Sequence, residues 1–252
     1  MPETHHLLKS RHLGNERSIW IRRPRDPAAP AQLAVFLDAE RYRDPAPRMD
    51  VLPLLDELTL SGALANTLLV FVSEHSAGAR WRECPCHLPF AGFINDELLP
   101  WLESLHPGIR TASQRVLIGL SYTGLAAAYV TYHGPGRWTH VISQSGSHWS
   151  TDEWLTARYR ELTAPLPTRF YLQVGRREMQ ENVRHREDVL QVVSQIDEVR
   201  RFRDALQSTR REVNYVEFDG GHDYAAWRRT LPGALRWALP APVAPPAQAA
   251  RG

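Results

Sequence analysis

The stretch that decides the fold is residues 116–125, Val-Leu-Ile-Gly-Leu-Ser-Tyr-Thr-Gly-Leu. An apolar run leads into Ser121, and an alanine-rich segment follows the second glycine. This layout is typical of a nucleophile elbow, a sharp strand-to-helix turn that lifts a serine hydroxyl above a sheet edge. At a helix N-terminus, backbone N–H groups and the helix dipole would favour a developing oxyanion. Thr123 replaces the second glycine of the usual G-x-S-x-G pattern, so an ordinary strand–helix junction is the alternative interpretation.

Short apolar runs, separated by segments of helical spacing, recur on both sides of the elbow. Such alternation predicts a mostly parallel sheet with helices on both faces, and the strands' carboxyl ends then share the edge where ligands bind. The sequence therefore predicts an α/β fold. The expected strands are 18–22, 33–37, 67–72, 115–120, 141–143, 170–174 and 213–218. The expected helices are 53–61, 93–102, 125–132, 182–207 and a last helix that contains Trp227.

The length and composition suit one globular domain. The chain has 252 residues, 43% of them hydrophobic and 23% charged, which fits a single large α/β unit. We expect residues 1–238 to form that domain and the Pro/Ala-rich residues 239–252 to be a disordered tail. The net charge of +2 argues against a nucleic-acid partner. Local basic groups such as Arg176 and Arg177 indicate either a solvated face or the mouth of a site for an anionic substrate.

Features of the sequence also predict the compartment. No run of about 18 apolar residues is present to span a membrane, and residues 1–18 have no apolar core of a secretory signal. Cys84 and Cys86 are too close for an unstrained disulfide, and with His87 they are too few for a metal site. Two reduced thiols suit a reducing compartment, so we expect a cytoplasmic protein.

A histidine and an acid downstream of the elbow complete a candidate triad. His222 follows the expected strand 213–218 and two glycines, which suits a loop that reaches a serine across the sheet edge. The chain order serine, acid, histidine places the acid between them, and Glu178 lies just past the expected strand 170–174. Its carboxylate would hold the imidazole in the required tautomer. The alternatives are that Glu178 opens the following helix, or that Glu181 or Asp223 is the acid.

Six segments in this order resemble the enterochelin (ferric enterobactin) esterases, within the esterase D-like branch of the α/β-hydrolases. They span roughly residues 15–235, and the resemblance implies the α/β-hydrolase fold with Ser121 and His222 as catalytic residues and Glu178 at the family's acid position. The segments are 34–40 (AVFLDAE), 80–86 (RWRECPC), 97–100 (ELLP), the elbow, 143–149 (SQSGSHW) and 220–223 (GGHD).

The resemblance also implies roles for other residues. The backbone N–H of Ala39 would form the oxyanion hole, with the N–H of Tyr122 as the other donor. Arg80 and Glu83 match an R-x-x-E pair that the family places beside the site, and we expect them to contact substrate. Without the resemblance, these two would be interpreted as an exposed loop pair.

The sequence departs from the family at three places. Ala39 and Thr123 stand where the family usually has glycine, and His87 stands where it often has asparagine. We also expect the protein to lack the extra N-terminal domain of the cytoplasmic members and the signal of the periplasmic ones.

We therefore expect a serine esterase that cleaves a small-molecule carboxylic ester, with a catechol trilactone siderophore as the candidate substrate. This chemistry requires no metal or organic cofactor. The alternatives are an acyltransferase or thioesterase with the same triad, and a catalytically silent binding protein of the same fold. The departures at Ala39 and Thr123 are the reason to retain the silent protein as an alternative.

Overall fold

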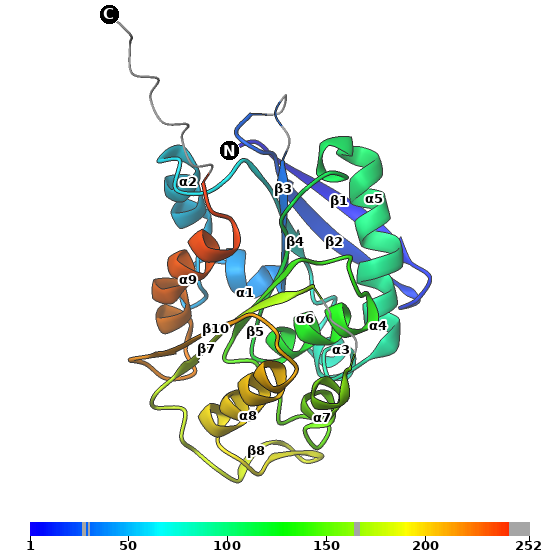
Figure 1. Cartoon of the computed structure of the whole chain (residues 1–252). Coiled ribbons are helices and arrows are strands. Elements are labelled where there is room, and N and C mark those ends of the chain that lie inside the picture. The colour runs from blue at the N-terminus through cyan, green and yellow to red at the C-terminus, as the bar shows by residue number, and fades with distance from the viewer. Residues whose placement is uncertain (27–28, 30, 164–166, 242–252) are drawn as a thin grey trace, which may run out of the picture.

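A single eight-stranded sheet forms the centre of the molecule, with helices packed on both of its faces (Figure 1). The computed structural model describes residues 1–26, 29, 31–163 and 167–241. The strand order is β1-β2-β4-β3-β5-β6-β7-β10; six strands are parallel, while β2 runs antiparallel to both β1 and β4. This confirms the expected mostly parallel sheet. The strands are β1 Glu3–Ser10, β2 Asn15–Arg22, β3 Gln32–Leu37, β4 Thr67–Val72, β5 Arg115–Leu120, β6 His140–Gln144, β7 Arg169–Gly175 and β10 Val213–Phe218.

The helices fall into two groups that cover opposite faces of the sheet (Figure 1). A π-helical turn, η1, links α4 to α5, and a short 3₁₀ turn, η2, follows α5. Among the described residues, no helix combines the length and the apolar character needed to cross a bilayer. The helices are α1 Ala39–Arg43, α2 Leu52–Leu60, α3 Ala77–Glu83, α4 Leu88–Gly92, η1 Phe93–Leu98, α5 Leu99–Leu105, η2 Pro107–Ile109, α6 Tyr122–His133, α7 Trp154–Glu161, α8 Gln195–Ser208 and α9 Tyr224–Ala238.

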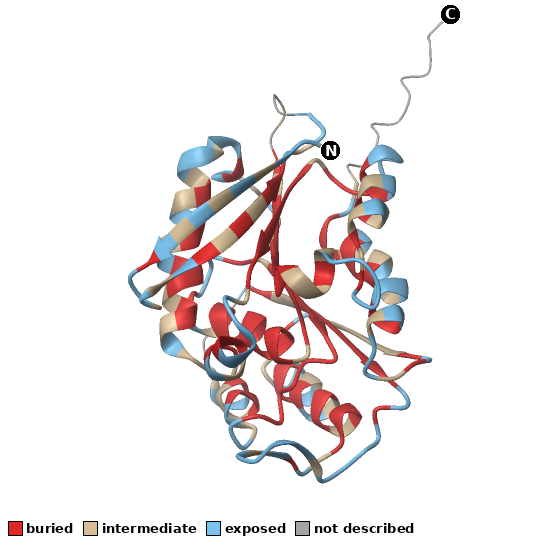
Figure 2. Cartoon of the chain, turned by 180° about the vertical axis from the view of Figure 1, so that it is seen from behind, coloured by how far each residue is buried: buried red, intermediate tan, exposed pale blue. Residues whose placement is uncertain are grey.

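Two apolar cores lie on the two sides of the sheet, and the central strands contribute to both. Along β3, Leu33, Val35 and Leu37 pack into one core, whereas Ala34 and Phe36 pack into the other. All five side chains are at most 1% exposed, and β3 and β5 are buried after their first residue (Figure 2). Burial of each large side chain contributes roughly 1.5–3 kcal/mol. Coverage of both faces explains why these strands are apolar runs rather than alternating ones.

The expected helix over 182–207 is wrong in its first half. A two-stranded antiparallel hairpin, β8 Val183–Arg186 and β9 Val189–Gln191, occupies that part of the chain, and α8 begins only at Gln195. Ser194 caps α8, because its side chain accepts a hydrogen bond from the backbone N–H of Asp197. The valines before Ser194 favour extended backbone. The helical spacing of the whole segment therefore predicted a helix that begins too early in the chain.

The C-terminal segment begins with packed residues. Leu239 is buried and donates its N–H to the carbonyl of Leu235, and Pro240 forms an isolated bridge with Leu64. Most of the expected tail, residues 242–252, lies outside the described residues.

Candidate active site

Ser121 lies on a sharp turn between the end of β5 and the start of α6. Its backbone angles are φ 53° and ψ −122°, a strained conformation for a residue with a side chain. Gly119 permits this turn, because a Cβ there would lie 2.1 Å from the carbonyl oxygen of Thr123. Gly124 permits close packing of α6, because a Cβ there would lie 2.7 Å from Ser143 Oγ. The two glycine requirements fall at positions 119 and 124, so the turn tolerates threonine at 123.

The hydroxyl of Thr123 is integrated into the elbow. It accepts a hydrogen bond from the backbone N–H of Leu120 at 3.0 Å and lies 3.1 Å from Asp38 Oδ2. Thr123 is 2% exposed. Thr123 departs from the family pattern, and the hydrogen-bonding capacity of its buried hydroxyl is therefore satisfied.

Glu178 and His222 are brought together from different loops at the same edge of the sheet. The Nδ1 atom of His222 lies 2.6 Å from Glu178 Oε2. The other carboxylate oxygen accepts hydrogen bonds from Ser145 Oγ at 2.6 Å and from the N–H of Gly175 at 2.7 Å. Glu178 is 5% exposed, so its charge is held by these donors in a largely dry position.

The two rival acids are placed elsewhere. Asp223 accepts a hydrogen bond from the N–H of Ala226 at 2.8 Å and caps α9. Glu181 is exposed on the loop after β7. Of the three acids considered, Glu178 is the one in contact with His222.

A tryptophan and a serine that sequence reasoning missed hold this pair in place. The His222 ring meets the Trp227 ring edge-on, with centroids 4.7 Å apart. The indole Nε1 of Trp227 donates to Ser145 Oγ at 2.9 Å, and Ser145 in turn donates to Glu178. Ser145 has a positive φ of 46°, and its position directly after β6 is the signal that could have identified it.

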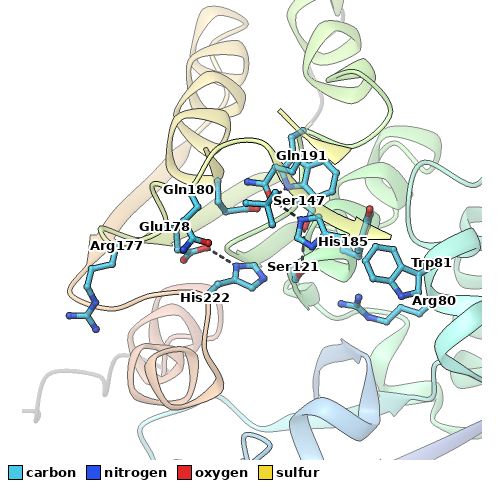
Figure 3. Close-up of a pocket in the computed structure, with 14 residues that line it drawn as sticks. Arg80, Trp81, Ser121, Ser147, Arg177, Glu178, Gln180, His185, Gln191 and His222 are labelled. Atoms are coloured by element: carbon cyan, nitrogen blue, oxygen red, sulfur yellow. Dashed lines mark hydrogen bonds and ion pairs between the residues drawn. The ribbon is translucent and has the colours of Figure 1, made fainter. Parts of the chain in front are cut away.

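Ser147 is a further neighbour of the nucleophile candidate. Its Oγ lies 3.3 Å from Ser121 Oγ, and its backbone N–H donates to the carbonyl of Ser121 at 3.0 Å. Figure 3 shows the His222 ring between Glu178 and Ser121, with Ser147 beside Ser121. Among the described residues no hydrogen bond joins His222 directly to Ser121; the contact between nucleophile and base is often long until substrate binds.

The predicted oxyanion donors are the first residues of two helices at this edge. Ala39 begins α1 after β3, and Tyr122 begins α6 after β5. The first N–H groups of a helix have no acceptor within the helix. Because β3 and β5 are parallel neighbours, with Phe36 opposite Ile118, the two helix starts lie at the same sheet edge.

Ser121, Glu178 and His222 open onto one pocket with a volume of about 400 Å³. Aromatic and basic side chains line it together with serines and glutamines (Figure 3). Trp149 stacks on His185 of β8, with centroids 5.2 Å apart and planes 6° apart. Other lining residues include Arg80, Trp81, Tyr122, Ser147, Arg177 and Gln191.

The interpretation of Arg80 and Glu83 as an exposed loop pair is wrong, because both lie on α3 and are only 6% and 3% exposed. Arg80 lines the pocket; its Nε donates to Asp38 Oδ2 at 2.8 Å. Glu83 does not line the pocket and instead forms a buried ion pair with Arg17 of β2.

Burial disfavours the charged forms of three other potential nucleophiles and bases. Cys84 and Cys86 are both unpaired. Burial raises the pKa of the Cys84 thiol far above its usual range and that of Cys86 to about 11. Burial also lowers the pKa of His148 to about 3. In the described part of the chain, no group of three or more His, Cys, Asp or Glu side chains is arranged to hold a metal ion.

Comparison with known proteins gives consistent matches. The family model described as "Putative esterase" matches residues 10–238. An iron(III) enterobactin esterase of Dickeya dadantii is 30% identical over 249 residues, which cover 92% of this chain and 53% of that protein. That of Escherichia coli K12 is 35% identical over 150 residues, covering 59% of this chain and 37% of that protein. The chain thus spans about half the length, or less, of these curated relatives.

A solved structure agrees with the sequence matches. The enterobactin esterase of Shigella flexneri, crystallised in the presence of enterobactin, superposes with a TM-score of 0.79 at 29% identity. The match covers 93% of this chain and 58% of that one. This neighbour has the α/β-hydrolase type of fold, as expected for the chain. The chain is a member of the esterase family, in the branch similar to the enterochelin esterases.

Proposed function

We propose that the protein is a serine esterase with Ser121 as nucleophile, His222 as general base and Glu178 as the acid that orients it. One observation carries the proposal: a 2.6 Å contact between His222 Nδ1 and the buried Glu178 carboxylate, beside a serine held at φ 53° in the same pocket. A carboxylate on Nδ1 keeps the proton there and leaves Nε2 free to accept the proton of Ser121.

The reaction is acyl transfer to water. Ser121 Oγ attacks the ester carbonyl carbon while His222 Nε2 takes the hydroxyl proton. The N–H groups of Ala39 and Tyr122 stabilise the oxyanion, and its collapse expels the alcohol, which receives the proton from His222. Water then attacks the acyl-enzyme, with His222 again as base, and releases the carboxylic acid.

The substrate we propose is a siderophore-type ester with aromatic acyl groups, such as a catechol trilactone. The names of the relatives support this class, and so does the pocket. Trp81, a partly exposed aromatic residue of the pocket lining, suits contact with an aromatic acyl group. Arg80 suits an anionic substrate, because Nη1 of its guanidinium has no acceptor in the described part of the chain. Arg177 also lines the pocket, but its guanidinium pairs with Asp219 at 3.1 Å and points away from Ser121 (Figure 3).

We also propose that the enzyme works in the cytoplasm. Support comes from Cys84 and Cys86, which remain unpaired. Detection of the protein in the cytosolic fraction of its native cells would support this location, and detection outside it would contradict it.

The test is hydrolysis of a short p-nitrophenyl ester, with ferric enterobactin followed in parallel by mass spectrometry. Wild type should cleave both, and Ser121→Ala should lose about 10³-fold or more in kcat. Ser104→Ala, an exposed serine on α5, is the matched control and should retain full activity. Turnover that survives Ser121→Ala would overturn the mechanism, and cleavage of the simple ester alone would overturn the substrate class.

A further inference from the structure

Two residues next to the proposed oxyanion donors are joined directly by a buried hydrogen bond. Asp38 precedes Ala39, and Thr123 follows Tyr122. Thr123 Oγ1 lies 3.1 Å from Asp38 Oδ2, and the two residues are 2% and 3% exposed. The contact therefore connects the end of β3 to the start of α6, the two segments that present the donors.

The Asp38 carboxylate is held on several sides. Its Oδ2 accepts from Arg80 Nε at 2.8 Å and lies 3.4 Å from Arg41 Nε. The Arg80 guanidinium also donates to the carbonyl of Leu120 at 3.4 Å, so it too spans from β3 to β5. The hydroxyl of Thr123 accepts from the N–H of Leu120 at 3.0 Å, which leaves its single proton to donate. The Asp38 carboxylate is a stronger acceptor for it than the Leu120 carbonyl, 2.9 Å away.

These contacts of the Asp38 side chain hold a backbone conformation that orients one of the proposed oxyanion donors. Asp38 has φ 74° and ψ 56°, the left-handed region that costs energy for residues other than glycine. That turn starts α1 at Ala39, so it sets the direction of the Ala39 N–H. A strained turn persists only where neighbouring contacts enforce it.

We infer that the Thr123–Asp38 hydrogen bond fixes the two oxyanion donors relative to each other, and that Thr123 is a positioning residue of the esterase site. The inference rests on the proposed function. It assigns a purpose to the threonine that stands in place of the family's glycine: its hydroxyl joins the nucleophile elbow to the oxyanion loop.

The expected effect is on the transition state rather than on substrate binding. Removal of an entire oxyanion donor lowers kcat by about 10²–10³-fold. Loss of the Thr123 hydroxyl leaves both donors present but less well aligned, so a decrease of about 10-fold is expected. The KM should change less than about 2-fold, because misaligned donors weaken transition-state binding selectively.

The experiment compares Thr123→Val, which keeps the shape and removes the hydroxyl, with Thr123→Ser, which keeps the hydroxyl. Thr131→Val is the matched control, because Thr131 is a fully buried threonine on the same helix whose hydroxyl bonds to the carbonyl of Ala128. We would measure kcat and KM for a p-nitrophenyl ester and the inhibition constant of a trifluoromethyl ketone, whose serine adduct carries an oxyanion. Thr123→Ala replaces the valine variant if valine does not fold.

Thr123→Val should lower kcat and raise the inhibition constant of the ketone by the same factor. Thr123→Ser and Thr131→Val should match wild type in kcat and in the inhibition constant. An unchanged kcat in folded Thr123→Val and Thr123→Ala would overturn the inference, and so would an equal loss in Thr131→Val. If wild type hydrolyses esters and the valine variant equals it, only the positioning role fails. If wild type hydrolyses no ester, the proposed function fails and this inference fails with it.

Discussion

Replacement of Glu178 by glutamine tests how the site controls its histidine. In the native site the carboxylate accepts three hydrogen bonds, from His222 Nδ1 and from the Ser145 and Gly175 donors. The side-chain carbonyl oxygen of glutamine can still accept the hydrogen bonds from Ser145 and Gly175, and its NH₂ group then faces His222. Because an NH₂ group donates, His222 Nδ1 must become the acceptor, which places the neutral ring's proton on Nε2. That tautomer cannot take the proton of Ser121.

The expected loss in kcat for Glu178→Gln is about 10³–10⁴-fold, which corresponds to roughly 4–5.5 kcal/mol of transition-state stabilisation. The assay is steady-state hydrolysis of p-nitrophenyl acetate, with far-UV circular dichroism to verify folding. The matched control is Glu181→Gln, an exposed residue on the same loop, which should retain wild-type activity. A folded Glu178→Gln variant with more than a tenth of wild-type kcat would refute the reasoning.

Three further outcomes follow from other buried positions. Burial, together with the nearby Glu153, raises the pKa of Glu198 well above its ordinary value of 4.5. Its ionisation therefore opposes folding as the pH rises above 4.5. Thermal melts should show that Glu198→Gln is more stable than wild type at pH 8 but not at pH 4. An equal gain in stability at the two pH values would contradict this. Gly119→Ala would place a Cβ 2.1 Å from a backbone carbonyl, so urea unfolding should show a loss of about 3 kcal/mol or more. The control substitution, Gly78→Ala, meets nothing within 4 Å and should be neutral or slightly stabilising. Glu83→Gln should leave the Arg17 charge buried and unpaired, which costs about 3–5 kcal/mol in the same assay; a raised KM with unchanged stability would instead indicate substrate contact.

The central strands and the elbow were predictable because local sequence determines them. Strand β4 contains five consecutive apolar residues, rich in valine and phenylalanine, and this pattern is typical of a strand that is buried on both faces. The glycine at 119 and the serine at 121 mark a backbone geometry that few other residues permit. Chain order then placed an acid and a histidine after two later strands, where the structure has Glu178 and His222 in contact.

The remaining features depend on tertiary contacts that local patterns do not encode. The edge strand β1 owes its extended form to full pairing with β2 over eight residues. The β8–β9 hairpin packs His185 on Trp149, a contact between segments far apart in the chain. The partners of Asp38 come from three separate helices, so its buried position could not be read from the strand that precedes it.

The most direct test of the central claim is covalent labelling with a p-nitrophenyl alkylphosphonate, followed by peptide mass spectrometry. Ser121 Oγ would form a bond to phosphorus, p-nitrophenolate would leave, and His222 would take the hydroxyl proton. The account predicts one adduct per chain, on Ser121, with labelling abolished in Ser121→Ala and slowed at least about 10²-fold in His222→Ala. An adduct on Ser147, whose hydroxyl lies 3.3 Å from that of Ser121, or labelling that persists in Ser121→Ala, would contradict it.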